Sequence, residues 1–217
     1  MLSKSRNFLF IHVPKTGGNS IQRVLLPFSD DRMVLTGPHH DGVERFEIRS
    51  PRLDIHKHST LQDYQQQLTV DEFAKLSKVT CVRNPWDRCV SFFFSPHRGE
   101  VEWTPKRFET FIRETVQPHA YFLSLPGQSD DPFDNLDFVL RFEHLDDDFA
   151  ALCAQLGIGD LDLPQINVSR RSDYRAYYTD QSLVDLVAEK FAPEIERFDY
   201  RFQHPEFGPT CAQTLSS

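Results

Sequence analysis

Three short, continuously apolar runs divide this sequence, at residues 8–13, 78–82 and 136–142. Runs of this length are typical of strands that are buried on both faces, as in a parallel sheet. A segment with apolar residues at helical spacing follows each run. The alternation of strand and helix favours an α/β fold, in which a central parallel β-sheet carries helices on both faces.

Helix boundaries are marked by residues that cap helices. Thr69, followed by Glu72 three positions later, forms a capping-box pattern and predicts a short helix before the second strand. Pro85 fits the first turn of a helix that runs toward Phe94, and Gly157 closes the helix after the third strand. Two further helical patterns lie at residues 104–115 and 180–198.

Two segments lack a periodic pattern. Residues 28–58 contain Ser-Pro, Gly-Pro and a pair of histidines, and we expect an irregular surface excursion of the kind that forms active-site rims. Residues 203–217 are expected to be a poorly ordered tail. The chain of 217 residues is long enough for one α/β domain and short for two, so we expect a single domain over residues 1–217.

The composition restricts the partners and the location of the protein. A formal net charge of −8 argues against a general affinity for nucleic acid or anionic membranes, which select basic surfaces. No apolar run approaches the roughly 20 residues of a membrane span, and the first run is too short for a signal peptide, so a cytoplasmic location is expected. The scattered cysteines are expected to be buried free thiols; they are Cys81, Cys89, Cys153 and Cys211.

The turn after the first strand has the composition of an anion-binding loop. A strand that enters a helix through a tight loop leaves backbone N–H groups unpaired at the helix N-terminus, where the helix dipole favours negative charge. Glycines let the backbone approach a ligand closely, and a lysine and polar side chains add donors. A nucleoside triphosphatase loop requires the lysine after the glycines, whereas here the lysine comes first. The loop residues are Pro14, Lys15, Thr16, Gly17, Gly18, Asn19 and Ser20.

The second strand leads to another group of anion ligands. Arg83 lies at its carboxyl end and Ser91 lies eight residues later, so that a guanidinium and a hydroxyl group can converge on one anion. The alternative is that Arg83 pairs with Asp87 while Ser91 faces a neighbouring helix. Arg88, which follows the helix start, is expected to be a surface salt-bridge partner.

Together, the two segments resemble the sulfotransferases that use 3′-phosphoadenosine 5′-phosphosulfate (PAPS). HVPKTGGNS at residues 12–20 is similar to the family's 5′-phosphosulfate loop, and VRNPWDRCVS at residues 82–91 is similar to its 3′-phosphate element. Residues 138–145 and 163–169 are similar to later blocks of the carbohydrate branch, which contains heparan sulfate 2-O-sulfotransferase and small bacterial relatives. The resemblance implies a P-loop-like sulfotransferase fold, PAPS as the donor, and contacts to its 3′-phosphate from Arg83 and Ser91.

Sulfuryl transfer to a hydroxyl needs a base, because an alcohol is a poor nucleophile until its proton is removed. Imidazole, with a pKa of about 6.5, suits this task at neutral pH. The chain offers His56 and His58 on either side of a lysine. The resemblance implies that a histidine of such an HxH segment is the base; His58 matches it, and His56 is the second candidate. Lys15 then faces the oxygen that leaves with the 5′-phosphate.

Other basic residues have open roles. Ser169, Arg170 and Arg171 either form a flap over the adenosine 3′-phosphate or belong to a solvated turn. The adjacent His39 and His40 suggest a metal ligand pair, but no carboxylate or cysteine set accompanies them, so no metal site is expected. The transfer itself requires no divalent metal, because the protein supplies the donors that the leaving group needs.

Three functions remain open on these motifs. The preferred hypothesis is a PAPS-dependent sulfotransferase that acts on a hydroxyl of a sugar or another small polar acceptor by in-line displacement. A nucleotide kinase or triphosphatase with an altered loop needs a metal-binding aspartate at a strand end, where this chain has Arg141, Phe142 and Glu143. The third is a non-catalytic adenosine-phosphate-binding module. The net negative charge makes a polyanionic glycosaminoglycan a poor match, so a neutral oligosaccharide, lipid-linked sugar or small metabolite is the expected acceptor.

Overall fold

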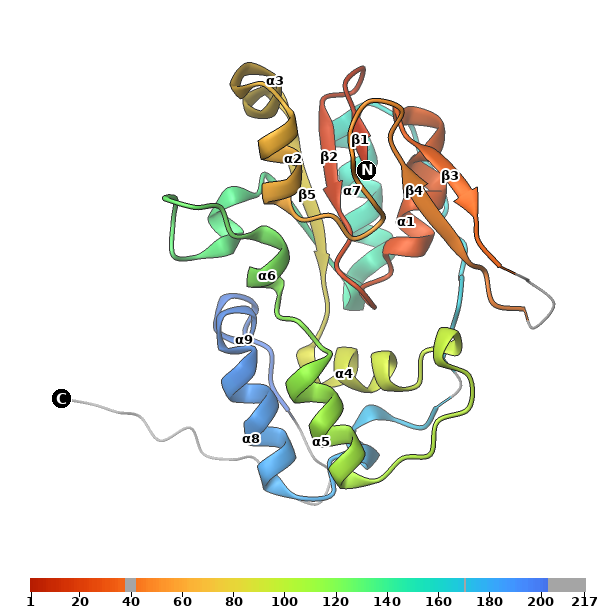
Figure 1. Cartoon of the computed structure of the whole chain (residues 1–217), viewed down its shortest axis with the longest axis vertical. Coiled ribbons are helices and arrows are strands. Elements are labelled where there is room, and N and C mark those ends of the chain that lie inside the picture. Colours follow the sequence, from red (N-terminus) through yellow and green to blue (C-terminus); the bar gives the residue numbers. More distant parts are fainter. Residues whose placement is uncertain (38–41, 170, 203–217) are drawn as a thin grey trace.

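The computed structural model, which describes residues 1–37, 42–169 and 171–202, has a four-stranded sheet at its centre (Figure 1). The strand order is β1-β2-β5-β6; β1 is antiparallel to β2, and the other three strands are parallel to one another. Parallel strands present their carboxyl ends at one edge of the sheet. The strands are β1 (Leu2–Ser3), β2 (Phe8–Ile11), β5 (Ser77–Val82) and β6 (Phe138–Arg141).

The three apolar runs of the sequence form the three parallel strands. β2 is completely buried, and β5 becomes buried toward its carboxyl end. The register pairs Ile11 with Thr80 and Val82 with Arg141, so the segments that follow neighbouring strands start side by side. The predicted α/β fold with a central parallel sheet is therefore confirmed. The tail expected at residues 203–217 lies outside the described residues.

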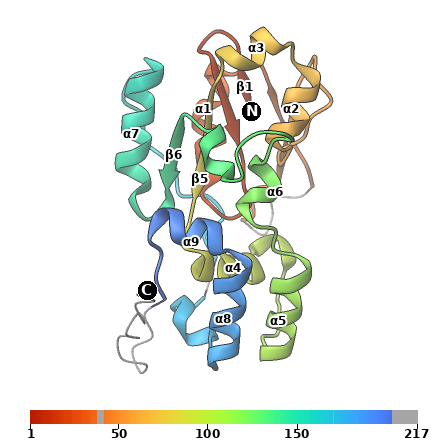
Figure 2. The same ribbon diagram turned by 90° about the vertical axis from the view of Figure 1, so that its left-hand side faces the viewer.

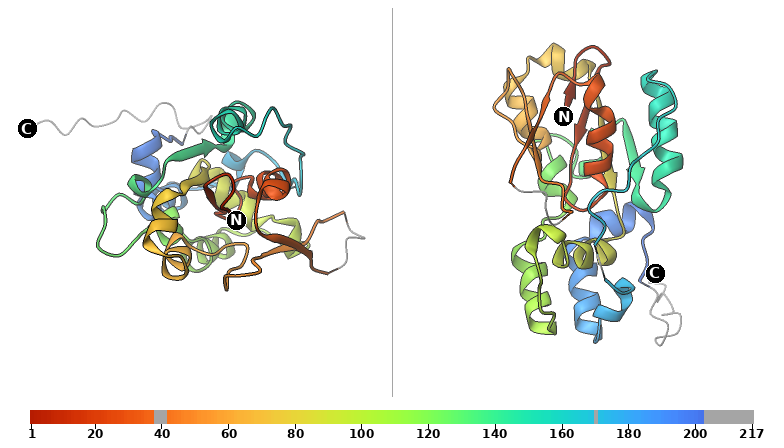
Figure 3. Two further views of the ribbon diagram at one scale, coloured as in Figure 1. Left: turned by 90° about the horizontal axis from the view of Figure 1, so that it is seen from above. Right: turned by 90° about the vertical axis from the view of Figure 1, so that its right-hand side faces the viewer.

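Helices cover both faces of the sheet. α1 (Gly18–Leu25) and α7 (Leu145–Leu156) lie against one face, whereas α2 (Leu61–Gln67) and α3 (Val70–Lys75) lie against the other (Figures 2 and 3). Among the described residues, no helix is both long and apolar enough to cross a membrane. Short 3₁₀ turns connect the elements at η1 (Leu26–Phe28), η2 (Pro96–Arg98), η3 (Pro132–Asn135), η4 (Phe142–His144) and η5 (Tyr174–Tyr177).

Capping residues start and end these helices. The hydroxyl of Thr69 accepts from the amide of Glu72, whose carboxylate accepts from the amide of Thr69, so the predicted capping box is confirmed. Thr60 and Asp63 make the same pair of contacts at the start of α2, a helix that its polar sequence did not predict. Gly157 ends α7 in the left-handed conformation, with φ at 62°.

The expectation of an irregular segment at residues 28–58 is wrong. The segment contains an antiparallel ribbon of β3 (Arg32–Leu35) and β4 (Phe46–Arg49), which is a sheet of its own beside α1 (Figure 1). Phe46 and Ile48 anchor the ribbon in the core, whereas the residues between and after them are more exposed. An alternation over four residues is too short to separate a strand from a loop in sequence.

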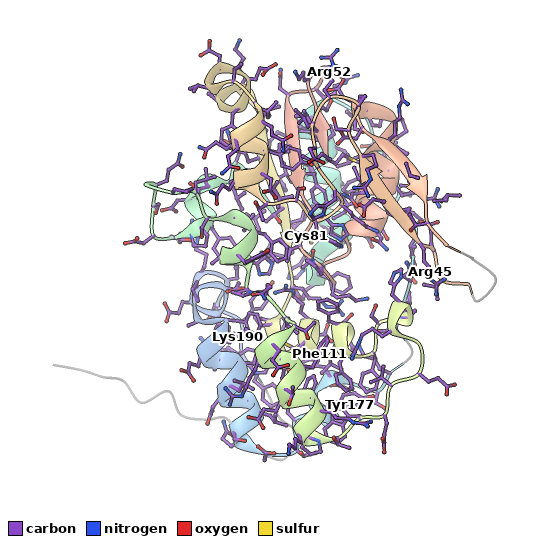
Figure 4. The ribbon with its side chains drawn as sticks, in the orientation of Figure 1. Arg45, Arg52, Cys81, Phe111, Tyr177 and Lys190 are labelled. Carbon is purple, nitrogen blue, oxygen red and sulfur yellow. The ribbon has the colours of Figure 1, made fainter. Side chains whose placement is uncertain are left out.

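A second layer of helices lies beyond the carboxyl edge of the sheet (Figures 1 and 2). Its core is aromatic: Phe93 packs edge-on against Phe108 and Phe111, and Figure 4 shows Phe111 inside this layer. The functional site therefore has the sheet edge on one side and packed helices on the other. The helices of this layer are α4 (Pro85–Phe93), α5 (Pro105–Glu114), α8 (Gln181–Lys190) and α9 (Ala192–Phe198), and α6 (His119–Leu123) connects the two layers.

Candidate functional site

A cleft of about 1150 Å³ opens at the carboxyl edge of the sheet. Both segments that the sequence singled out contribute to its wall, because β2 and β5 are neighbours and the chain turns into α1 and α4 at their ends. Thr16 and His56 do not line this cleft, and Arg170 lies outside the described residues. The predicted site residues that do line it are Pro14, Lys15, Gly17, Gly18, Asn19, Ser20, His58, Arg83, Ser91, Ser169 and Arg171.

The loop between β2 and α1 is built to leave backbone donors free. Gly17 caps α1 in the left-handed conformation, with φ at 87°. Within the described chain, the amides of Gly17, Gly18 and Asn19 have no hydrogen-bond partner, and all three residues line the cleft. The hydroxyl of Thr16 donates to the Val13 carbonyl at 2.9 Å instead of facing the cleft. The loop thus offers an anion its amides and the positive end of the helix dipole.

Gly18 is required by the ring of His12, which packs directly beneath it. A Cβ atom on Gly18 would lie 2.0 Å from Cδ2 of His12 and 2.3 Å from its Nε2. His12 Nδ1 donates to Oε1 of Gln22 at 3.0 Å, which fixes the ring plane. Burial lowers the pKa of His12 well below its usual range, so this ring is neutral.

Arg83 joins the two predicted anion sites. Its Nη1 donates to the carbonyl of Lys15 at 3.0 Å and to the hydroxyl of Ser91 at 3.2 Å. Its Nε donates to Asp87 at 2.8 Å, and its guanidinium lies 3.8 Å from the ring centroid of Phe142. The two alternatives for Arg83 in the sequence therefore coexist, since it pairs with Asp87 and also meets Ser91.

Arg171 lies against the same carboxylate. It pairs with Oδ1 of Asp87, whereas Arg83 pairs with Oδ2, so that Asp87 lies between two guanidinium groups. The Nε of Arg171 also donates to the hydroxyl of Ser169 at 3.2 Å, and its side chain is only 11% exposed. Ser169 and Arg171 thus line the cleft next to Arg83, and the role of the segment over a bound 3′-phosphate stays a prediction.

Lys15 reaches into the cleft from a left-handed backbone conformation, with φ at 71°. Its Nζ donates to the hydroxyl of Ser95 at 3.5 Å. Burial, and after it the charges of Arg83 and Arg171, lowers the pKa of Lys15 from 10.5 to about 8. Because Arg83 and Arg171 repel the Lys15 ammonium group, an anion bound in the cleft would stabilise it.

The hydrogen bond of His58 to the backbone fixes its tautomer, with the proton on Nδ1. Nδ1 lies 3.0 Å from the carbonyl oxygen of His12, and a carbonyl only accepts, so Nδ1 donates and Nε2 keeps its lone pair. Burial lowers the pKa of His58 from 6.5 to about 4, and the charge of Lys57 adds to this effect. His56 is exposed, and its Nδ1 accepts from the amide of His58 at 3.1 Å. Of the two histidines, only His58 presents a proton acceptor to the cleft.

Sequence reasoning missed the role of Lys57. This side chain is nine-tenths buried, lines the cleft and lies 3.5 Å from the ring centroid of Phe46, whose carbonyl accepts from Nζ at 3.3 Å. In the described part of the chain, no carboxylate oxygen lies within 4.0 Å of Nζ. Burial lowers the pKa of Lys57 to about 8. Its position between the two candidate histidines was the available signal.

The expectation of a surface salt bridge for Arg88 is wrong. Its side chain is fully buried, with Nε donating to the carbonyl of Pro14 at 3.0 Å and Nη2 to that of Gln117 at 2.7 Å. α4 is the helix of this layer next to the sheet edge, and most of its residues, Arg88 among them, are buried. At the position of Arg88 the helix therefore has no side that faces solvent.

The cleft is basic although the chain is acidic. Its wall contains twice as many cationic as anionic side chains, so the local field opposes the formal charge of −8. In the residues that the structure describes, no three histidine, cysteine, aspartate or glutamate side chains are grouped as metal ligands; His39 and His40 lie outside these residues. The cations are Lys15, Arg45, Lys57, Arg83, Arg98 and Arg171, and the anions are Glu47, Asp146 and Asp173.

Asn167 holds the rim of the cleft together. Its Oδ1 accepts from the amide of Glu44 at 2.8 Å, and its Nδ2 donates to the carbonyl of Glu44 at 2.8 Å. The same Nδ2 lies 3.3 Å from Nε2 of His97, which is in η2. The side chain thus joins the ribbon, the segment after α7 and the segment after α4. Figure 4 shows Arg45 at this end of the ribbon, close to the helical layer.

The chain is similar to known proteins in its sequence pattern and in its structure. The model of a family described as "Sulfotransferase family" matches residues 1–201 of this chain. A crystal structure of a sulfotransferase from Alicyclobacillus acidocaldarius is similar at 19% sequence identity, with a TM-score of 0.45; the match covers 90% of this chain and 96% of that one. No curated protein matches the sequence.

Proposed function

Because this chain belongs to the sulfotransferase family, we propose that it transfers a sulfuryl group from PAPS to a hydroxyl of a polar acceptor. The observation that carries the proposal is the bridge made by Arg83, whose Nη1 contacts both the Lys15 carbonyl and the Ser91 hydroxyl. One guanidinium therefore spans two anion-binding elements at neighbouring strand ends. PAPS has anionic groups at both ends of its ribose, as such a pair of elements requires.

The residues present fit this donor. Arg83, Ser91 and Arg171 would hold the 3′-phosphate, since both guanidinium groups already lie on one carboxylate. The free amides after Lys15 would hold the 5′-phosphosulfate. The cleft of about 1150 Å³ exceeds the usual volume for one small ligand, about 300–1000 Å³, and so leaves room for an acceptor.

The chemistry assigned to the chain's own residues follows from charge. Nε2 of His58 takes the proton of the acceptor hydroxyl as its oxygen bonds to sulfur. The bond between sulfur and the bridging oxygen breaks, and the negative charge that develops on this oxygen is stabilised by the ammonium group of Lys15. The proton of the acceptor hydroxyl is accounted for, because it remains on His58 until solvent removes it.

The local charge of the cleft changes the expected acceptor. A neutral acceptor was inferred from the net charge of the whole chain, but the wall beside His58 and the ribbon has two cations, Lys57 and Arg45, and one carboxylate, Glu47. We therefore propose an acceptor, sugar or small metabolite, that carries an anionic group beside its reacting hydroxyl. Lys57 favours this reading because burial lowers its pKa to about 8 despite the nearby charges of Glu47 and Glu44, and an anion in the cleft would stabilise its ammonium group.

The competing enzyme class lacks support at the third strand. A nucleotide kinase or triphosphatase needs a carboxylate free to hold magnesium. Glu143 instead accepts from the amide of Asn84 at 2.7 Å and from the hydroxyl of Tyr200 at 3.1 Å, and Arg141 pairs with Asp148. A non-catalytic module would have no use for the lone pair that His58 Nε2 presents to the cleft.

A transfer assay with radiolabelled PAPS tests the proposal. A panel of neutral and anionic hydroxyl compounds is incubated with the protein, with and without chelator. Transfer that survives chelation and falls to a low but measurable rate in Lys15→Ala supports the proposal. Dependence on ATP and magnesium would overturn it in favour of phosphoryl transfer. A melting temperature raised by 3′-phosphoadenosine 5′-phosphate, with no acceptor labelled, would identify a binding module.

A further inference from the structure

Two consecutive carbonyls of the loop are each held by an arginine of the segment after β5. Arg88 Nε donates to Pro14 O at 3.0 Å, and Arg83 Nη1 donates to Lys15 O at 3.0 Å. Lys15 has φ at 71°, a conformation that residues with a Cβ atom rarely adopt. The backbone on both sides of this disfavoured conformation is thus held by charge-assisted hydrogen bonds.

Arg88 is the more deeply buried of the two arginines, although its Nη1 has no hydrogen-bond partner in the described chain. Its Nη2 donates to the carbonyl of Gln117 at 2.7 Å, so one planar guanidinium spans two chain segments. The side chain is 1% exposed and does not line the cleft, whereas Arg83 does. Arg88 therefore contacts the loop on the side away from the cleft, where it would touch neither the donor nor the acceptor.

A buried set of polar residues supports Arg88 from the helical layer. Glu194 on α9 accepts from the amide and from Nδ1 of His119 at 2.8 Å each. Burial opposes its ionisation, but the hydrogen bonds from His119 and the charge of Arg88 outweigh burial and lower the pKa of Glu194. The ring of Phe191 lies 5.8 Å from the guanidinium. The carboxylate of Glu194 on α9 thus partly compensates the buried positive charge of Arg88, which holds the loop.

We propose that Arg88 is a positioning residue for sulfuryl transfer, which fixes the Pro14–Lys15 backbone so that the Lys15 ammonium meets the leaving oxygen. This inference rests on the proposed function. It predicts that a change at Arg88 acts on the transfer step more than on donor binding, because the amides that bind the donor start after Lys15. A misplacement of about 1 Å at a reacting group lowers the rate roughly 100-fold.

Arg88→Lys keeps the charge and removes the planar span between two carbonyls. We expect kcat to fall roughly 10- to 100-fold while the KM for PAPS changes less than about 3-fold. In a Lys15→Ala background, Arg88→Lys should add less than about a 3-fold loss, because its target is gone. Arg107→Lys on the exposed side of α5 is the matched control. Equal losses in both backgrounds, or an unchanged kcat, would overturn the inference.

A readout that does not depend on turnover separates this inference from the proposed function. The pKa of Lys15 is measured by NMR after methylation with ¹³C-formaldehyde, with Lys15→Arg identifying the signal. We expect Arg88→Lys to raise this pKa from about 8 toward 10.5, because the loosened loop admits water. An unchanged pKa refutes the positioning role even if no acceptor is ever found. If Arg88→Lys does not fold, Arg88→Gln with Glu194→Gln removes both buried charges together and is measured in the same way.

Discussion

Nδ1 of His58 lies 3.0 Å from the carbonyl oxygen of His12, the residue that follows β2. The ring that we propose as the base is thereby attached to the strand end from which the loop of Lys15 starts. The rings of the two histidines are also in contact, with centroids 4.5 Å apart. His58 and the loop are therefore both held at the carboxyl end of β2.

Replacing His58 by asparagine should abolish catalysis and spare the fold. The amide of asparagine can donate to the His12 carbonyl in place of Nδ1 but has no group at the position of Nε2. We expect kcat to fall roughly 10²- to 10⁴-fold, the usual worth of a general base. His56→Asn is the control and should keep activity within a few-fold, since His56 does not line the cleft. Similar losses in both variants would contradict the assignment.

The pH dependence of kcat/KM for PAPS should show a plateau between about pH 4 and about pH 8. His58 accepts a proton only above its pKa of about 4, so activity falls as the pH drops through that value. Lys15 loses its charge as the pH rises through about 8. Lys57 has a pKa of about 8 as well, so Lys57→Met decides which lysine sets the alkaline limb. An acid limb near pH 6.5 would show that the buried His58 is not the base.

Asp87→Asn should lower stability and increase the response to product. The carboxylate pairs with Arg83 and Arg171, so its loss leaves two buried cations facing each other and costs on the order of 3 kcal/mol of unfolding free energy. A 3′-phosphate would replace the missing charge. Thermal melts should therefore show a lower melting temperature without ligand and a larger rise with 3′-phosphoadenosine 5′-phosphate than in the native protein. Asp185→Asn on α8 is the exposed control, and an equal rise in both variants would argue against a phosphate at this site.

Gly18→Ala should disrupt the loop through His12 alone. Gly18 begins α1 with ordinary helical geometry, but a Cβ atom would lie 2.0 Å from Cδ2 of His12. We expect a lower melting temperature and at least a 10-fold loss of donor affinity, because an overpacked contact displaces the amides. Adding His12→Ala to this variant removes the ring and should raise the melting temperature again. No recovery in the double variant would mean that the glycine serves another purpose.

The parts of the fold that could be predicted are those encoded locally. β2, β5 and β6 are continuous apolar runs, and the box at Thr69 and Glu72 depends on residues three apart. The ribbon escaped prediction because each of its strands has four residues and only Phe46 and Ile48 of β4 are buried. α2 escaped because its sequence, LQDYQQQ, has almost no apolar face.

In the site, too, the local patterns were predictable and the long-range contacts were not. The spacing of Arg83 and Ser91 around a helix start predicted that they meet, and Nη1 of Arg83 lies 3.2 Å from Oγ of Ser91. Arg88 was misjudged because its partner, Pro14, is 74 residues away, and no local pattern shows which side of α4 is closed by other elements. Lys57 was overlooked because the sequence does not show that a lysine is buried. Its burial depends on the ring of Phe46, which packs against it only in the folded chain.

The clamp at Asn167 has a consequence for how such a protein can diversify. The ribbon belongs to a different sheet from β2 and β5, and Asn167 fastens it across the cleft through the backbone of Glu44. Contacts to backbone atoms do not depend on which side chains the ribbon carries. The exposed positions of the ribbon can therefore vary in sequence, whereas Phe46 and Ile48, which anchor it in the core, and Glu47, which accepts from the Lys57 amide, are constrained.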